Sequence, residues 1–184
     1  MLRTHPRLET DRLKLRPFLP EDAIAFSRLA GERDVADTMI ALPHPLSESA
    51  ARTTIAANAA EFQQSRALHF AMELKSQPAL VGGVDIRDID REHRQGELSF
   101  WVARDHWGEG FAIEASAAVL VWAFRELGLN RIFARHLLRD SGSGAVLHKL
   151  GMKLEGTMRE GVRKWGQFED VALCSLLRSD LSGV

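Results

Sequence analysis

The chain has 184 residues, of which 45% are hydrophobic, and its formal net charge is −1. This length and apolar content fit one domain with a core of its own, so we expect a single domain over residues 1–184. Lysine and arginine are spread along the chain, which excludes the basic stripe of a nucleic-acid-binding protein. No run of about 18 apolar residues occurs, so no transmembrane helix is expected. Cys174 is the only cysteine, which makes a reducing cytoplasm the expected location.

The first half of the chain predicts a strand, two helices and a hairpin. Alternating apolar residues that end at a proline indicate a strand near a sheet edge, and proline with acids in a first turn indicates a helix start. The expected elements are a strand at 12–18, a helix at 20–31, a loop at 39–45, a helix at 46–66, and a hairpin of strands at 69–75 and 80–86.

The second half predicts strands and helices that do not alternate strictly. The expected elements are a strand at 96–103, a helix at about 109–127, a strand at 131–138, a short helix at 143–150, and two final strands around a turn at 165–166. The long helix should bury one stripe, formed by Ile113, Ala117, Leu120, Val121 and Phe124. This order favours a mixed sheet in an α/β domain over a doubly wound fold.

A strand end, a glycine-containing turn and a helix start follow one another between Trp101 and Ala115. Gly108 and Gly110 let the backbone approach a ligand closely, and the first N–H groups of a helix have no partner within it. The turn therefore predicts a site for an anion such as phosphate. The dinucleotide fingerprint fails because Ile113 stands where its third glycine belongs, and the Gly-Lys-Ser/Thr of a P-loop is missing.

The stretch from His106 to Ala115 resembles the acetyl-CoA pyrophosphate loop of the GNAT N-acetyltransferases. Their pattern, Arg/Gln-x-x-Gly-x-Gly/Ala, puts Trp107 at the Arg/Gln position, Gly110 at the glycine and Ala112 at the small residue. A tryptophan followed by glycine at this point is typical of the branch that contains the ribosomal-protein alanine N-acetyltransferases. The resemblance implies that acetyl-CoA is the co-substrate, held by Trp101, Val102, Trp107, Gly108, Glu109, Gly110, Phe111 and Ala112.

Three further segments, residues 8–16, 140–152 and 154–160, resemble the same branch in the same order. The implied fold is a single α/β domain with a mixed, mostly antiparallel central sheet, splayed at the cofactor-binding strand and flanked by helices. Asp140 stands where the family has an asparagine that binds the pantetheine arm, and Ser143 stands at the family's serine. An ionised acid can accept an N–H there but cannot donate one.

Acetyl transfer needs a neutral amine, a polarised carbonyl and a proton for the departing thiolate. Glu97, on the strand that leads to the glycine turn, is the candidate base, with a solvated or salt-bridged strand residue as the alternative. For the carbonyl, the resemblance implies a backbone N–H near Val102. Many GNAT enzymes use a tyrosine as general acid, but this chain has none. Ser143 is the best substitute, with a helix N-cap as the alternative.

The remaining polar residues predict no metal site, because His69, His106, His136 and His148 lack a metal-binding spacing. Cys174 is expected to be a small core residue, and Trp165 is a candidate wall of the acceptor site.

The resemblance implies an acetyl-CoA-dependent enzyme that acetylates a protein N-terminus. The alternatives are a small amine acceptor, namely an amino acid, a polyamine or an antibiotic, and a non-catalytic acyl-CoA sensor. The loop from Met39 to Pro45 and the turn at Trp165 are expected to shape the acceptor pocket. No nucleic acid or membrane partner is expected, and a homodimer stays open.

Overall fold

The computed structural model describes residues 4–181. Its strands are β1 (Leu8–Glu9), β2 (Leu13–Pro17), β3 (Leu68–Leu74), β4 (Leu80–Asp90), β5 (Gln95–Val102), β6 (Arg131–Leu137), β7 (Lys153–Lys164) and β8 (Gln167–Leu177). Its α-helices are α1 (Ala23–Ala30), α2 (Arg33–Thr38), α3 (Glu48–Gln63), α4 (Phe111–Glu126) and α5 (Ser141–Lys149), with short 3₁₀ turns at Pro20–Asp22, Arg104–His106 and Arg178–Leu181.

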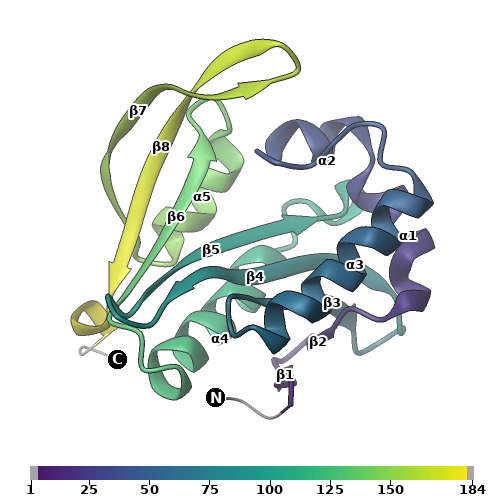
Figure 1. Cartoon of the computed structure of the whole chain (residues 1–184), viewed down its shortest axis with the longest axis horizontal. Coiled ribbons are helices and arrows are strands. Elements are labelled where there is room, and N and C mark those ends of the chain that lie inside the picture. Colours follow the sequence, from purple (N-terminus) through teal and green to yellow (C-terminus); the bar gives the residue numbers. More distant parts are fainter. Residues whose placement is uncertain (1–3, 182–184) are drawn as a thin grey trace.

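The strands form one mixed sheet in the order β1-β2-β3-β4-β5-β6-β8-β7. β5 and β6 are parallel, whereas the other neighbouring strands in the described sheet are antiparallel. The parallel pairing covers only Gln95 to Glu97 against Arg131 to Phe133. Beyond it the two strands diverge, so that the sheet opens into a V between β5 and β6 (Figure 1). The predicted mixed, mostly antiparallel and splayed sheet is confirmed.

Two hydrophobic layers cover the sheet. On one face, α4 packs on the strands through a core that includes Val84, Leu98 and Phe124. On the other face, α1 and α3 pack through Phe26, Ile55 and Trp101. Strand alternation decides which layer each β5 side chain enters, since successive residues point to opposite faces. Glu97, Ser99 and Trp101 consequently lie on the α1/α3 face, and Leu98, Phe100 and Val102 on the α4 face.

The buried stripe of α4 differs from the predicted one. Leu120 and Phe124 are buried as expected, but Val121 is 38% exposed, and Ile113 and Ala117 are only half-buried. The face that meets the sheet carries Phe111, Ala115, Ser116, Val119 and Ala123 instead. Apolar residues surround this helix on nearly every side, so periodicity alone does not identify the inner face. The small Ala115 and Ala123, both fully buried, let the helix approach the strands closely.

Two unexpected elements and two helix starts also differ from the sequence-based prediction. The two-residue β1 and the six-residue α2 were not expected, because segments this short show no clear period. α4 begins at Phe111, after Gly110, and α5 begins at Ser141, after Asp140. The hairpins β3–β4 and β7–β8 and the loop at 39–45 are where the sequence predicts them.

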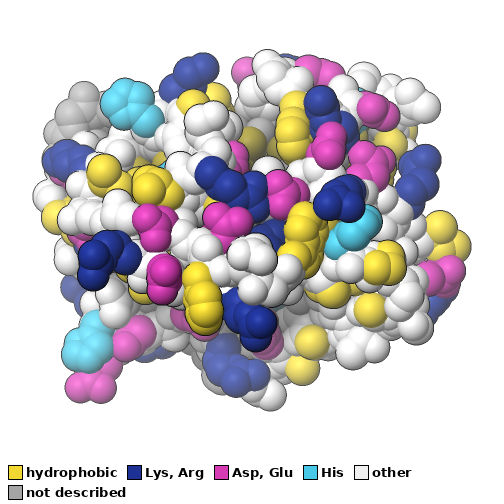
Figure 2. Space-filling model, turned by 90° about the horizontal axis from the view of Figure 1, so that it is seen from above, with side chains coloured by type: hydrophobic (Ala, Val, Ile, Leu, Met, Phe, Trp, Pro, Cys, Tyr) yellow, Lys and Arg dark blue, Asp and Glu magenta, His cyan; other side chains and the backbone are white. Residues whose placement is uncertain are grey.

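Acidic and basic side chains are interspersed over the face shown in Figure 2, with no patch of a single sign. None of the helices within residues 4–181 combines the length and the apolar character that crossing a membrane requires. Cys174 is buried in the core on β8, as predicted, and burial raises the pKa of its thiol.

Candidate active site

The end of β5 presents backbone groups to the V of the sheet. The N–H of Ala103 donates to the carbonyl of Val81 on β4, at an N–O distance of 2.8 Å. Backbone groups of adjacent strand residues point to opposite sides, so those of Val102 point away from β4. Its carbonyl accepts the indole N–H of Trp107 at 2.8 Å. The N–H of Val102 therefore faces the V, as the resemblance predicts for the donor that polarises the thioester carbonyl.

The glycine turn leads into α4 with its first amides uncapped. Gly108 and Gly110 have φ angles of +83° and +85°, a left-handed conformation that other residues adopt only with strain. Gly110 is the N-cap of α4, and no side chain caps the helix. The N–H groups of Phe111, Ala112 and Ile113 precede the first possible intrahelical bond. They are available to an anion and lie at the positive end of the helix dipole.

A clasp of three side chains holds this turn against the N-terminal strands. The guanidinium of Arg12 donates from Nη1 to the carbonyl of Glu109 at 3.0 Å and pairs through Nε with the Glu114 carboxylate at 2.6 Å. It also lies 4.5 Å from the centre of the Phe111 ring. Thr10 completes the clasp by donating its hydroxyl proton to Glu114. The turn is therefore braced by residues about a hundred positions earlier in the chain, which the sequence analysis did not assign to the site.

A cavity of about 410 Å³ lies between β5, the glycine turn, α4 and α5. Its lining includes nine of the ten predicted cofactor-binding residues, namely Trp101, Val102, Trp107, Gly108, Gly110, Phe111, Ala112, Asp140 and Ser143. Glu109 is the exception, since its carboxylate contacts the His106 ring at 3.1 Å and does not line the cavity. Sequence reasoning missed Lys149, which brings a positive charge to the lining from the last turn of α5.

The start of α5 separates the roles of Asp140 and Ser143. Asp140 is the N-cap, and its Oδ1 accepts the backbone N–H of Ser143 at 3.0 Å. The alternative assignment of Ser143 as the helix cap is therefore wrong. The other carboxylate oxygen of Asp140, Oδ2, is buried and has no hydrogen-bond partner within the described chain. It is a free acceptor in the wall of the cavity.

A second, smaller cavity of about 50 Å³ adjoins the first. Ser143, Phe100 and Thr38 line both cavities and mark the junction between them. The hydroxyl of Ser143 makes no hydrogen bond to another residue in the 4–181 range, so it can donate to a ligand at this junction. The other lining residues of the second cavity are Met39, Ile40, Ala41, Arg87, Leu98, Ser99, Ala134, Arg135, His136 and Leu147.

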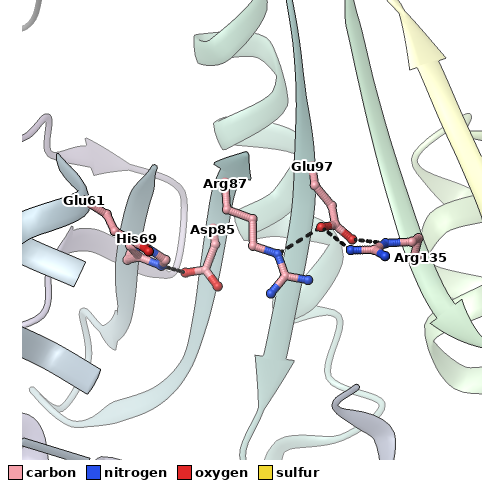
Figure 3. Close-up of polar contacts among 6 residues, drawn as sticks. All are labelled: Glu61, His69, Asp85, Arg87, Glu97 and Arg135. Carbon is pink, nitrogen blue, oxygen red and sulfur yellow. Dashed lines mark hydrogen bonds and ion pairs between the residues drawn. The ribbon is translucent and has the colours of Figure 1, made fainter. Parts of the chain in front are cut away.

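Glu97 lies beside this cavity but does not line it. Its side chain is 1% exposed, and both carboxylate oxygens are engaged by arginines. Arg135 donates to Oε1 at 2.8 Å and to Oε2 at 3.0 Å, and Arg87 donates to Oε2 at 3.1 Å (Figure 3). Burial alone raises the pKa of Glu97, but the two arginines outweigh it, and the pKa lies below its ordinary value. This geometry is that of the salt-bridged alternative, and a lowered pKa weakens the carboxylate as a base.

His69 on β3 lies on the same face of the sheet as Glu97, between Asp85 of β4 and Glu61 of α3 (Figure 3). The ring contacts Asp85 through Nδ1 at 3.0 Å and Glu61 through Nε2 at 2.8 Å. Burial lowers the pKa of His69, but the two carboxylates outweigh it and raise the pKa to about 9. His69 is therefore an imidazolium at neutral pH that ties α3 to the strands, and it occupies the carboxylate of Asp85.

His136 is a candidate proton acceptor that the sequence analysis passed over. Its Nδ1 lies 2.9 Å from the carbonyl oxygen of Leu137, which can only accept, so Nδ1 carries a proton and Nε2 is the acceptor atom of the neutral tautomer. Gly144 makes room for this ring, because a Cβ there would stand 3.1 Å from its Cε1 atom. The imidazole of His136 lines the second cavity, where it could take a proton from an amine.

The walls of the second cavity agree in part with the prediction. Met39, Ile40 and Ala41 come from the predicted loop, whereas Trp165 lines neither cavity and packs against His44. Lys164, beside it in the β7–β8 hairpin, donates to the carbonyl of Met39 at 2.6 Å. The hairpin thus acts on the cavity indirectly, by holding the loop.

No group of three metal-binding side chains occurs within residues 4–181.

Comparison with known proteins identifies the family. Residues 12–153 match the acetyltransferase (GNAT) domain family. The uncharacterized N-acetyltransferase YoaA of Bacillus subtilis is 30% identical over 173 residues, which are 94% of this chain and 97% of YoaA. Among solved structures, RimJ of Mycobacterium smegmatis in complex with a CoA-disulfide superposes with a TM-score of 0.87 at 25% identity, covering 97% of this chain and 92% of RimJ.

The ribosomal-protein-S5-alanine acetyltransferase of Vibrio fischeri has the same fold, with a TM-score of 0.85 at 21% identity over 95% of this chain and 98% of that one. The family match covers more than half of the chain, the relative in Bacillus subtilis spans nearly all of it, and the fold agrees with both. The chain is therefore a GNAT acetyltransferase.

Proposed function

We propose that this acetyltransferase transfers the acetyl group of acetyl-CoA to the N-terminal amine of a protein. The observation that carries the proposal is the pair of adjoining cavities that meet at Ser143 and Phe100. The larger one has the features of a donor site and the smaller one is placed to receive an amine. We further propose that residues 1–184 form one N-acetyltransferase domain and that the enzyme works in the cytoplasm.

The lining of the larger cavity suits coenzyme A, which the solved RimJ structure contains. The uncapped amides of α4 and the ammonium of Lys149 favour the pyrophosphate. The free Oδ2 of Asp140 can accept an amide N–H of the pantetheine arm. When bound, the donor supplies an activated acyl thioester. As the C–N bond forms and the C–S bond breaks, the N–H of Val102 would stabilise the developing oxyanion and His136 would take the proton that the amine loses. The hydroxyl of Ser143 would pass a proton to the leaving sulfur and regain one from solvent.

The charge of the smaller cavity supports a peptide acceptor over a polyamine. Its charged lining residues are Arg87 and Arg135, with His136 beside them, and no acidic side chain is in the lining. A polyamine carries several positive charges, and those that do not react would be repelled here. A peptide N-terminus has a single amine to present, so the protein acceptor is favoured over the polyamine.

A thiol-release assay with acetyl-CoA against a panel of acceptors tests this proposal. We expect turnover with N-terminal peptides and little with spermidine or an aminoglycoside. Turnover restricted to small amines would contradict the peptide acceptor. Tight binding of acetyl-CoA without turnover on any acceptor would contradict catalysis and support a sensor.

Replacement of Asp140 tests the donor site. In Asp140→Asn, the amide oxygen is expected to keep the cap to Ser143, which places an NH₂ group where the unpartnered Oδ2 now lies. If the ligand presents an N–H there, two donors meet, and we expect the KM for acetyl-CoA to rise roughly 10-fold. Steady-state kinetics with calorimetric Kd values measure the effect. An unchanged or lower KM would show that Asp140 receives no N–H from the donor.

A further inference from the structure

We infer that the acceptor carries a carboxylate close to its reacting amine, and that Arg87, with Arg135, recognises it. This inference rests on the proposed acetyl transfer and narrows its substrate class. For a peptide acceptor, it predicts an acidic residue at the second or third position.

The two guanidinium groups have hydrogen-bonding capacity to spare. Arg87 uses only Nε on Glu97, and Arg135 uses Nε and Nη2. Within the described residues, neither Nη atom of Arg87 nor Nη1 of Arg135 donates to a protein acceptor. Their side chains are 29% and 33% exposed, so the free N–H groups are accessible. A forked guanidinium with two free Nη groups matches a carboxylate geometrically.

The local charge leaves a positive excess in this cavity. Two arginines share the one buried carboxylate of Glu97, so their group has a net charge of about +1. Asp85, two residues before Arg87 on β4, is engaged by His69. Asp88 attracts Arg135 electrostatically but does not line the cavity. An anionic ligand would therefore find unmatched positive charge in a partly dehydrated site.

Glu97 holds the two arginines in place. Arg87 is on β4 and Arg135 on β6, and the carboxylate on β5 between them bonds both (Figure 3). Without it, two like charges would face each other and each long side chain would sample other rotamers. Glu97 is on this account a positioning residue, which acts on the acceptor through the arginines.

The distances along β5 agree with an acceptor of this kind. Glu97 is three residues before Phe100, which lies at the junction of the cavities, and a strand rises about 3.3 Å per residue. The separation is thus about 10 Å, part of which the arginine side chains span. An extended peptide advances about 3.5 Å per residue, so an acidic side chain at its second or third position can reach the guanidinium groups. The carboxylate of a free amino acid is a second source of the same chemistry.

The test compares acceptors that differ by one charge. Peptides that begin Ala-Glu, Ala-Gln and Ala-Lys, or that carry Glu at position three, are assayed with free glutamate and aspartate as separate arms. We expect kcat/KM to be at least about 10-fold higher for the acidic peptide than for its Gln counterpart. If free glutamate and aspartate were acetylated efficiently and the acidic peptides were not preferred, the recognised carboxylate would be that of a free amino acid. This result would overturn the prediction of an acidic peptide.

Arg87→Gln should remove this preference by raising the KM of the acidic acceptor about 10-fold, so that the acidic peptide is used no better than its Gln counterpart. Arg87→Lys should restore part of it, because the charge returns without the fork. Arg91→Gln, an exposed residue of the β4–β5 turn, is the charge-matched control. Equal kcat/KM for acidic, neutral and basic peptides would overturn the inference and leave the proposed function standing. Failure of every acceptor would instead contradict the proposed function.

Discussion

Ser143→Ala is expected to lower kcat about 100-fold at neutral pH, the usual contribution of a positioned general acid, and to leave thermal stability unchanged. The chain has no tyrosine, so no phenol can protonate the leaving thiolate. The hydroxyl of Ser143 is unpaired in the described structure and lies where the two cavities meet. Because Asp140 caps α5, removal of this hydroxyl should not weaken the helix. Thiol release and thermal unfolding, measured on the same preparation, check both statements.

Ser141→Ala is the matched control for this prediction. Ser141 begins the same helix, is exposed and lines neither cavity, so its loss should change neither kcat nor stability. A Ser143 variant with wild-type kcat would show that water protonates the leaving thiolate, or that the thiolate leaves without being protonated. A higher KM for acetyl-CoA with normal kcat would indicate a binding role instead.

Glu97→Gln is expected to destabilise the protein by about 2 kcal/mol, because it removes the charge that two arginines share. It should also raise the KM for an acidic acceptor about 10-fold, since the arginines lose their anchor. Denaturant unfolding and acceptor kinetics measure the two effects. Glu92→Gln, an exposed residue in the β4–β5 turn, removes the same charge without touching the arginines and serves as the control.

The pH dependence separates this role from that of a base. The pKa of Glu97 lies below its ordinary value of 4.5, so its stabilising contribution is present above that value and is lost as the pH falls through the lowered pKa. The wild-type free energy of unfolding should therefore fall more steeply in this acidic window than that of the Gln variant. A loss of about 100-fold in kcat, together with a changed pH profile of kcat, would instead establish Glu97 as the general base.

The glycine turn of the candidate donor site could be predicted because its signals are local. The positive φ angles at Gly108 and Gly110 require glycine, and a helix start follows within one residue, so a short stretch of sequence carries the whole device. Which residue caps α5 was harder to predict. Asp140 and Ser143 are both good caps, and only the observed bond from the Ser143 amide to the Asp140 carboxylate identifies which one acts.

The candidate acceptor site depends on contacts between distant segments. Arg87 and Arg135 are on different strands and meet only because the sheet places Glu97 between them. Strand alternation placed Glu97 on the correct face but could not show what faces it from β4 and β6. Similarly, Lys164 donates to the carbonyl of Met39, 125 positions earlier in the chain, a contact that no local pattern indicates. The candidate acceptor site thus depends on pairings between distant segments that only the tertiary structure reveals.

The clasp formed by Arg12, Thr10 and Glu114 makes donor binding and the docking of the N-terminal strands thermodynamically linked. Arg12 holds the carbonyl of Glu109, immediately before the amides proposed to receive the pyrophosphate. Coupling between two events is reciprocal, so a ligand that orders the turn also secures the β1–β2 segment by the same free energy. A protein with an altered N-terminus can therefore remain folded and still bind its donor poorly, with the defect arising far along the chain from the motif that defines the site.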